Sequence, residues 1–592
     1  MELQKKDVII IGLSFCLLFT SGISILLLYS TFNYDYPRPP QMEVLVIGMG
    51  SGPNDLDPTD SWDSTSNNVI EQVVETLFTY DTRQFVVDET MPRINWLATG
   101  YSWDVTNTIL TVDIRTGVRF HDGTLMDAAA VAWNFNRFIY LMNHTGELSS
   151  DERAVKIHSL YEFPDGTPIF ESVITLDSDT VVFTLTAPYA PILDAMCYIS
   201  CGILSPASTP ATEIIDWRTG DIVGTGPYEY DYYIMDTEVK FTRFDEYWAT
   251  ATPYNLEDPV MFDAMVYAII DNTAALNYAM LAGDIDIIFG AMNELLPTFG
   301  ANPFIKVHEV SKPGLEYHYL VFNNKIINVT WRKAMSYAID YDNIINNLLE
   351  GRAYRAYSVI SSGYGDAFNS SLTNPNGGSA YYNLTIARQT ILDGLGNDPR
   401  IDPRLQANDT IDDPLWLHSN FVAFNYSYNL DNQFRADLYP LLNDSFADIG
   451  IELGDGHADW FYFILRAYGY VPGGYDDLEI YYVSWGPDYM DPFNVLNPLF
   501  SNASFSNACQ VKDFWIQNWL FDALTETNQS ARNEIYHKIQ SRIYTRLYCH
   551  APIYHNQIIS VHSADLYDIE YNPMERWWAL PVKRNYTWVP NY

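Results

Sequence analysis

Val118-Arg119-Phe120-His121-Asp122-Gly123-Thr124 stands shortly before the run Asp127-Ala128-Ala129-Ala130-Val131-Ala132-Trp133-Asn134-Phe135. The alternation of Val118 and Phe120 predicts a half-buried strand, and Asp122-Gly123 predicts a tight turn. Asp127 is suited to cap a helix on which Val131 and Phe135 share one face. The stretch therefore predicts a strand, a turn and a capped helix in direct succession.

Five other parts of the chain combine strand or helix patterns with characteristic polar residues. They are Ile47 to Asp57-Pro58 with Val73-Val74-Glu75-Thr76-Leu77; Gly224-Thr225-Gly226-Pro227-Tyr228 with Phe244 to Trp248; Leu281 to Asp286; Phe322-Asn323 with Ala334 to Asp340; and Trp485-Gly486-Pro487-Asp488-Tyr489-Met490-Asp491-Pro492-Phe493. In this order, and together with the stretch at 118–135, they resemble the motifs of the family 5 extracellular solute-binding proteins, the oligopeptide-, dipeptide- and nickel-binding type, of ABC transporters.

The interspersed helix and strand patterns indicate an α/β fold. The resemblance implies the architecture: a two-lobed periplasmic-binding-protein-like fold of type II, in the large peptide-binding class. We expect lobe I to comprise residues 43–312 and, after the chain returns, 487–592. Lobe II is expected to comprise residues 313–486.

Composition limits the classes of function. The chain has 592 residues, 48% of them hydrophobic and 15% aromatic, which is ample material for packed cores and argues against disorder. Its formal net charge of -41 repels phosphate backbones. We therefore expect no nucleic-acid partner.

The N-terminus predicts a membrane anchor. Lys5 and Lys6 precede an uncharged apolar run from Val8 to Tyr29 that is long enough to span a bilayer. The positive-inside rule places residues 1–7 in the cytoplasm, with 8–29 as the transmembrane anchor and 30–42 as a linker. The expected location is the cell membrane, single-pass, with the large domain extracellular; a cleaved signal peptide is the alternative.

Two further features fit an outside location. Four cysteines, Cys197, Cys201, Cys509 and Cys549, form an even set for which three disulfide pairings are possible. We prefer Cys197 with Cys201 and Cys509 with Cys549, and free buried thiols or a zinc site are the alternatives. Candidate glycosylation sites in Asn-x-Ser/Thr tripeptides include Asn143, Asn328, Asn383, Asn425, Asn443, Asn502 and Asn585.

The carboxylates near position 490 are the main candidates for function. The run from Ile480 to Val483 predicts a buried strand. Asp488 follows at the C-terminal end of this strand, where open α/β sheets tend to bind ligands. The family resemblance implies that Asp488 takes the α-amino group of a bound peptide. It also implies that Tyr482, Val483, Ser484 and Trp485 hold the peptide main chain by strand-like hydrogen bonds.

Asp491 precedes Pro492 and is interpreted as a cap for the following helix. A hydrolase that uses Asp488 and Asp491 as a carboxylate pair remains an alternative. No motif for a nucleophile or a metal protease occurs in the chain, so we interpret His121 as structural.

We therefore expect a solute-binding protein that captures short peptides between two lobes and delivers them to the transmembrane permease subunits of an ABC importer. The expected chemistry is reversible binding by a monomeric ectodomain, with no catalytic residue, cofactor or metal. Alternatives are the same scaffold binding a metal chelate, a sugar or another solute, and a sensory protein.

Overall fold

The computed structural model describes residues 43–585, apart from the segments 62, 83–90, 144–157, 217–220, 250–261, 396–398, 407–410, 413, 430–431, 459, 468–477, 505, 570–571, 575 and 579–580. The described chain alternates between strands and helices, as the sequence predicts for an α/β fold.

An eleven-stranded mixed sheet organises the described residues. Its path runs β15-β14-β16-β12-β17-β11-β1-β10-β9-β8, and β13 pairs with β17. The bounds are β1 Val44–Met49, β8 Tyr228–Ile234, β9 Glu238–Arg243, β10 Ala264–Ile269, β11 Ile287–Ile288, β12 Ile305–Phe322, β13 Ala353–Arg355, β14 Val422–Asn429, β15 Ile451–Ala458, β16 Ile480–Trp485 and β17 His550–Ser563.

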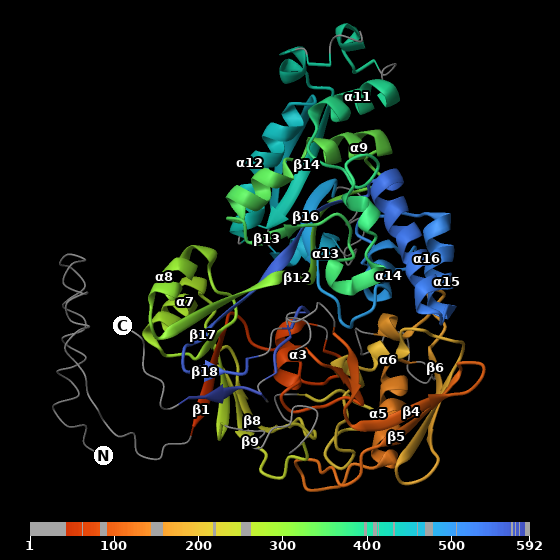
Figure 1. Ribbon diagram of the computed structural model, residues 1–592, viewed down its shortest axis with the longest axis vertical. Coiled ribbons are helices and arrows are strands. Elements are labelled where there is room, and N and C mark those ends of the chain that lie inside the picture. Colours follow the sequence, from red (N-terminus) through yellow and green to blue (C-terminus); the bar gives the residue numbers. More distant parts are fainter. Residues whose placement is uncertain are drawn as a thin grey trace, which may run out of the picture. The chain divides into compact units, whose positions relative to one another are not determined.

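The long strands β12 and β17 pair antiparallel (Figure 1). β12 contributes residues to three hydrophobic cores, and β17 contributes to two of them. Ile305 at the start of β12 packs in a small core with helices α7 and α8, while Tyr317 and Tyr319 pack in the largest core. Leu320 and Phe322, on the opposite face of β12, pack in a third core with α9 and α12. Because side chains alternate across a strand, one strand serves two cores at once.

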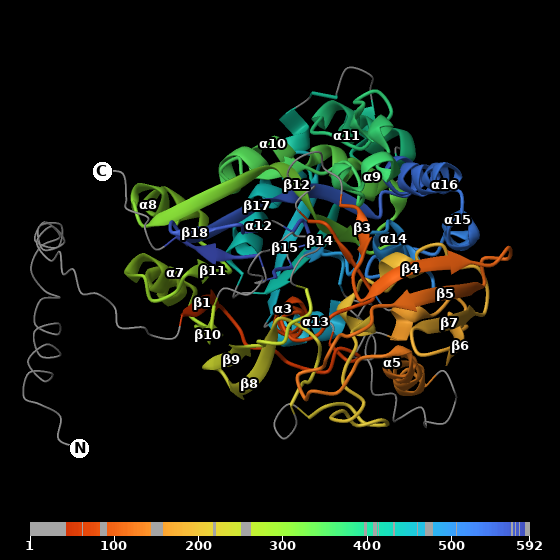
Figure 2. The same cartoon turned by 60° about the horizontal axis from the view of Figure 1, so that its bottom comes forward.

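A second, four-stranded antiparallel sheet has the order β4-β5-β7-β6 and is packed against helix α5 (Figure 2). Its strands are β4 Ala98–Trp103, β5 Ile109–Ile114, β6 Phe170–Thr175 and β7 Thr180–Leu185. Two-stranded sheets are formed by β2 Phe78–Tyr80 with β3 Arg93–Asn95 and by β18 Leu566–Tyr567 with β19 Lys583–Arg584.

The α-helices are α3 Ser64–Ile70, α5 Ala128–Leu141, α6 Ile192–Ala195, α7 Thr273–Ala282, α8 Leu296–Ala301, α9 Val329–Ala338, α10 Tyr341–Asn343, α11 Leu384–Leu395, α12 Gln433–Ala447, α13 Trp460–Ala467, α14 Phe493–Phe500, α15 Phe514–Thr525 and α16 Gln529–Arg542. Single 3-10 turns are η1 His158–Tyr161, η2 Ile199–Cys201, η3 Asn293–Leu295, η5 Ser362–Ala367, η6 Ser370–Thr373, η7 Pro403–Gln406 and η8 Pro414–His418. Two π-helical turns are η4 Ile344–Leu348 and η9 Ile543–Leu547.

The opening stretch folds largely as expected. The Asp127 carboxylate accepts from the Ala130 N–H at 2.9 Å and caps α5, on which Val131 and Phe135 are both buried. The predicted strand at 118–120 is only an isolated bridge between Arg119 and Leu125. The tight turn reverses the chain before a ladder can form.

Three of the sequence motifs meet around residues 72–75. The His121 N–H donates to the Gly224 carbonyl at 3.0 Å, and the Gly226 N–H donates to the Val73 carbonyl at 2.8 Å. A Cβ at Gly224 would lie 2.1 Å from the Val73 carbonyl oxygen. Glu75 is buried and accepts from four neutral donors, which are Trp96, Thr225, Tyr247 and Trp248. These motifs therefore build the fold and leave Glu75 no open acceptor for a ligand.

The predicted disulfides are absent from the part of the chain that the structure describes, so this expectation was wrong. Cys197, Cys201, Cys509 and Cys549 are all buried thiols. Cys197 donates to the Leu193 carbonyl, Cys201 donates to the Tyr161 hydroxyl, and Cys509 forms hydrogen bonds with Asn507 and Cys549. Hydrogen bonds inside the core satisfy these thiols without a covalent bridge, which is the alternative of free buried thiols.

The predicted membrane anchor also requires correction. Across the described ranges, no helix combines the length and the apolar character needed to cross a bilayer. This finding contradicts the expected single-pass location in the cell membrane. The run at 8–29 itself lies outside the described residues.

Candidate functional site

The strand β16 has one open edge near its C-terminal end. On one side it pairs antiparallel with β12 along its whole length, from Ile480 opposite Phe322 to Trp485 opposite Tyr317. On the other side its parallel ladder with β14 has only two pairs and ends at Tyr481. Beyond that point, the ladders of the described residues assign no strand to this side of residues 482–485. A peptide main chain could therefore pair with this edge as an added strand.

The side chains of these four residues have different environments. Tyr482 and Val483 are buried, and each whole residue is only 3% exposed. The Tyr482 hydroxyl lies 2.6 Å from His318 Nδ1 and 3.0 Å from the Tyr554 hydroxyl. Ser484 and Trp485 are partly exposed, and Trp485 Nε1 is buried with no hydrogen-bond partner in the part of the chain that the structure describes.

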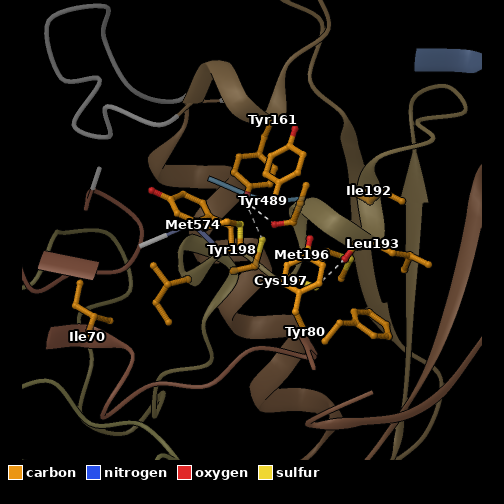
Figure 3. Packing of buried hydrophobic residues seen from close by; sticks show 14 of the residues in the cluster. Ile70, Tyr80, Tyr161, Ile192, Leu193, Met196, Cys197, Tyr198, Tyr489 and Met574 are labelled. Atoms are coloured by element: carbon orange, nitrogen blue, oxygen red, sulfur yellow. Dashed lines mark hydrogen bonds between the residues drawn. The ribbon is translucent and has the colours of Figure 1, made fainter. Parts of the chain in front are cut away.

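Asp488 lies in the loop between β16 and α14 and is held by neutral donors. Its N–H donates to Asn494 Oδ1 at 2.7 Å, and Asn494 Nδ2 donates to Asp488 Oδ2 at 3.0 Å. The Tyr198 hydroxyl also hydrogen-bonds this carboxylate. Burial raises the pKa of Asp488, and Asn494, Arg576 and Tyr198 oppose that rise. Figure 3 shows Tyr198 among buried side chains that include the adjacent Cys197 and, from distant segments, Tyr489 and Met574.

Arg576 approaches Asp488 but binds its main chain. One guanidinium nitrogen, Nη2, donates to the Asp488 carbonyl oxygen, while Nη1 donates to Glu71 Oε1 at 2.9 Å. The guanidinium carbon lies 4.6 Å from the centre of the Tyr198 ring. The cluster therefore contains two carboxylates, Glu71 and Asp488, and one guanidinium.

Asp491 has a structural role. Its two oxygens form an ion pair with Arg532, at 2.8 Å for each of the two nitrogens, and both side chains are 4% exposed. The Tyr536 hydroxyl and the Phe493 N–H donate to the same carboxylate at 3.0 and 2.8 Å. Asp491 thus accepts from the first N–H of α14, while the N-cap position of this helix is Pro492 and not, as was expected, Asp491. A carboxylate with all these partners is a poor catalytic acid or base, which argues against the hydrolase alternative.

Arg576 lines two cavities. The larger one, of about 550 Å³, falls within the size range of small-ligand sites. Its wall comes from the ends of β1 and β11, from β17, from α3 and from the C-terminal segment; it includes Met49, Ser64, Thr65, Asn68, Gln557, Asn572, Arg576 and Trp577. The smaller cavity, of about 90 Å³, is lined by Glu71, Tyr80, Arg576 and Trp577, among others.

Trp577 lines both cavities and is 7% exposed, and its Nε1 has no hydrogen-bond partner among the described residues. A buried N–H without a partner is unfavourable, so a ligand oxygen at this position would satisfy it. The sequence analysis found Asp488 and the β16 edge but missed Glu71, Arg576 and Trp577. Glu71 and Arg576 are 505 positions apart, and no spacing pattern connects them.

Comparison with known proteins places the chain among binding proteins. The sequence profile described as "Bacterial extracellular solute-binding proteins, family 5 Middle" matches residues 93–507. The glutathione-binding protein GsiB of Pectobacterium atrosepticum is 28% identical over 315 residues, which is 52% of this chain and 54% of the relative. GsiB of Escherichia coli K12 is 26% identical over 320 residues, covering 53% and 56%. The chain thus spans about half the length of the curated relatives it matches.

Solved structures show the same fold at low sequence identity. The dipeptide-binding protein of Pseudoalteromonas sp. SM9913, in complex with Met-Leu, superposes with a TM-score of 0.72 at 20% identity, covering 92% of this chain and 100% of the other. Helicobacter pylori DppA, in complex with the peptide STSA, has a TM-score of 0.70 at 20% identity and coverages of 91% and 98%. NikZ of Campylobacter jejuni, in complex with Ni(L-His), has a TM-score of 0.69 at 18% identity and coverages of 90% and 96%.

Proposed function

This chain belongs to the bacterial extracellular solute-binding proteins of family 5, and we propose that it captures short peptides reversibly for the transmembrane permease of an ABC importer. The family consists of binding proteins, so the chemistry needs no covalent step. The named relatives bind glutathione, and two of the three named structural neighbours are in complex with peptides, which supports a peptide as the ligand; the third, NikZ, is in complex with Ni(L-His).

The observation that carries the proposal is the Asp488 carboxylate beside the open edge of β16. The carboxylate accepts from two neutral donors, Asn494 and Tyr198, and no ion pair to it occurs among the described residues. A peptide ammonium would supply the missing positive charge through charge-assisted hydrogen bonds. The main chain of Tyr482, Val483, Ser484 and Trp485 would then pair with the peptide backbone, which allows side chains of many kinds.

The proposed lobes divide the chain at 43–312 and 487–592 for lobe I and at 313–486 for lobe II. The first proposed crossing, near residues 313–323, falls in the second half of β12 and at its end, and the second, near residues 484–488, begins at the end of β16 and continues into the following loop. Lobe closure around the ligand would bury it by a hinge motion. The seven candidate glycosylation asparagines, from Asn143 to Asn585, are all at least partly exposed, and their modification stays a prediction.

A ligand panel tests the class of solute. Purified protein is mixed with di- to pentapeptides, with Ni(L-His) chelate or with disaccharides, and the melting temperature is measured for each. Because a ligand that binds only the folded state raises the melting temperature, we expect peptides alone to raise it. A rise with the chelate or a sugar, and none with any peptide, would instead support another solute on the same scaffold.

A further inference from the structure

We propose that Glu71 is a positioning residue for ligand binding: by holding the Arg576 guanidinium, it keeps the Asp488 carboxylate available for the ligand's ammonium group. This inference rests on the proposed function, and it assigns a role to a residue that does not itself contact the peptide. Three segments remote in sequence supply the cluster: the end of α3, the loop after β16 and the C-terminal segment.

Arg576 binds the side chain of one acidic residue and the main chain of another. The guanidinium lies 10% exposed between two carboxylate residues. It donates to the side chain of Glu71 and to the main-chain carbonyl of Asp488, and these bonds leave the Asp488 side chain to Asn494 and Tyr198. The Glu71 carboxylate is therefore the ion-pair partner of Arg576.

The formal charges of Glu71, Arg576 and Asp488 determine which group is left for the ligand. Glu71 and Arg576 neutralise each other, so the cluster keeps one net negative charge, and that charge resides on Asp488. A peptide ammonium completes the balance. Without the Glu71 charge, the Arg576 guanidinium would lose its ion-pair partner and could pair with the Asp488 side chain, and a buried carboxylate gains from such a pair. The ligand ammonium would then have to displace an internal guanidinium.

The burial of the cluster makes these charges effective at short range. Glu71 has a side chain that is 20% exposed, and burial raises its pKa while Arg576 opposes the rise. Charges in such surroundings are screened less by water and salt than those on the surface. Moving one guanidinium by a few ångströms should therefore change the affinity for a cationic group.

The test measures coupling between the two residues by titration calorimetry with one free-amino peptide from the panel. We expect Glu71→Gln to weaken binding about tenfold or more in the otherwise unmutated protein, the scale of a misplaced unit charge at a partly buried site. In the Arg576→Met background, the same Glu71→Gln change should weaken binding by less than about threefold, because no guanidinium is left to occupy Asp488.

A matched control comes from another ion pair of the C-terminal segment. Arg584 pairs with Asp286, with side chains 11% and 18% exposed, close to the values for Arg576 and Glu71. Asp286→Asn, alone and with Arg584→Met, should lower the melting temperature and leave peptide affinity nearly unchanged. The control thereby separates loss of a structural ion pair from the proposed effect on Asp488.

The outcomes distinguish this inference from the proposed function. If Glu71→Gln weakens binding by the same factor with and without Arg576, Glu71 has only a structural role and the inference is wrong. If the unmutated protein binds free and N-acetylated peptides equally well, the ammonium site itself is absent and the proposed function falls with it. A small Glu71 effect in both backgrounds, with a strong preference for free amino termini, would overturn the inference alone.

Discussion

At the scale of single residues, motif positions were readable from the sequence while their partners were not. Asp57 stands in a recognisable Asp-Pro turn, and Asp488 follows a recognisable strand. The partners of these residues, Arg137 and Arg576, lie 80 and 88 positions away and carry no motif of their own. A hydrogen-bond partner is set by tertiary packing, so short-range patterns identify one half of each pair.

The ion pair between Asp57 and Arg137 should contribute strongly to stability. Their side chains are 0% and 2% exposed, so removing one partner leaves a buried charge unpaired. We expect Arg137→Met to lower the free energy of unfolding by about 3–5 kcal/mol at pH 7, measured by urea denaturation. Arg404→Met, which removes an exposed partner of Asp402, should change it by less than about 1 kcal/mol.

The loss of stability caused by Arg137→Met should depend on pH, because the pKa of Asp57 is shifted in the folded protein. Burial alone would raise the pKa of Asp57, but the charge and hydrogen bonds of Arg137 outweigh it and the pKa is lowered. The stabilisation is therefore present above the unfolded value of 3.8 and is lost as the pH falls below it. The deficit of Arg137→Met should shrink at pH 3.5. A deficit that is equal at both pH values would contradict the account.

At the scale of elements, local sequence signals predicted helices better than they predicted the pairing of strands. The cap at Asp127 and the strand at 480–483 were foreseen, because a cap and a buried apolar run are local signals. The strand expected at 118–120 was not formed, since a ladder needs a partner that sequence alone does not supply. The open edge of β16 is likewise a property of how β14 diverges from it.

Where residues 72–75 pack against residues 224–228, the backbones are too close to admit a side chain at Gly224. At Gly224 a Cβ would meet the Val73 backbone, which cannot rotate away, so we expect Gly224→Ala to lower the free energy of unfolding by about 1–3 kcal/mol or more. At Gly300, in α8, a Cβ meets nothing within 4 Å. Gly300→Ala should be neutral or stabilise by up to about 1 kcal/mol in the same denaturation experiment. Equal effects at the two sites would argue against the close packing.

At the scale of the whole molecule, the interspersed helix and strand patterns predicted the α/β class, and six short motifs in order predicted the family. The motifs work because several of them occupy contacts that define the fold, as Glu75 and Gly224 do. Two other expectations failed, the membrane anchor and the disulfides. The disulfides were inferred from an even count of cysteines, yet all four cysteines are buried thiols satisfied by hydrogen bonds. A cysteine count says nothing about the packing around each sulfur.

The central claim is that the Asp488 carboxylate binds the ammonium group of a peptide, and calorimetry on two ligands tests it most directly. Free and N-acetylated forms of one peptide are titrated into the unmutated protein and into Asp488→Asn. Because one partner of a buried charge pair is lost in either case, acetylation or the substitution alone should weaken binding by about 30-fold or more, equivalent to about 2 kcal/mol.

The combination of the two changes should add little, since both remove the same interaction. The melting temperature of Asp488→Asn without ligand checks that the fold is kept. The account predicts that the protein with Asp488→Asn binds the two peptides about equally. Equal affinity of the unmutated protein for the free and the acetylated peptide would contradict it.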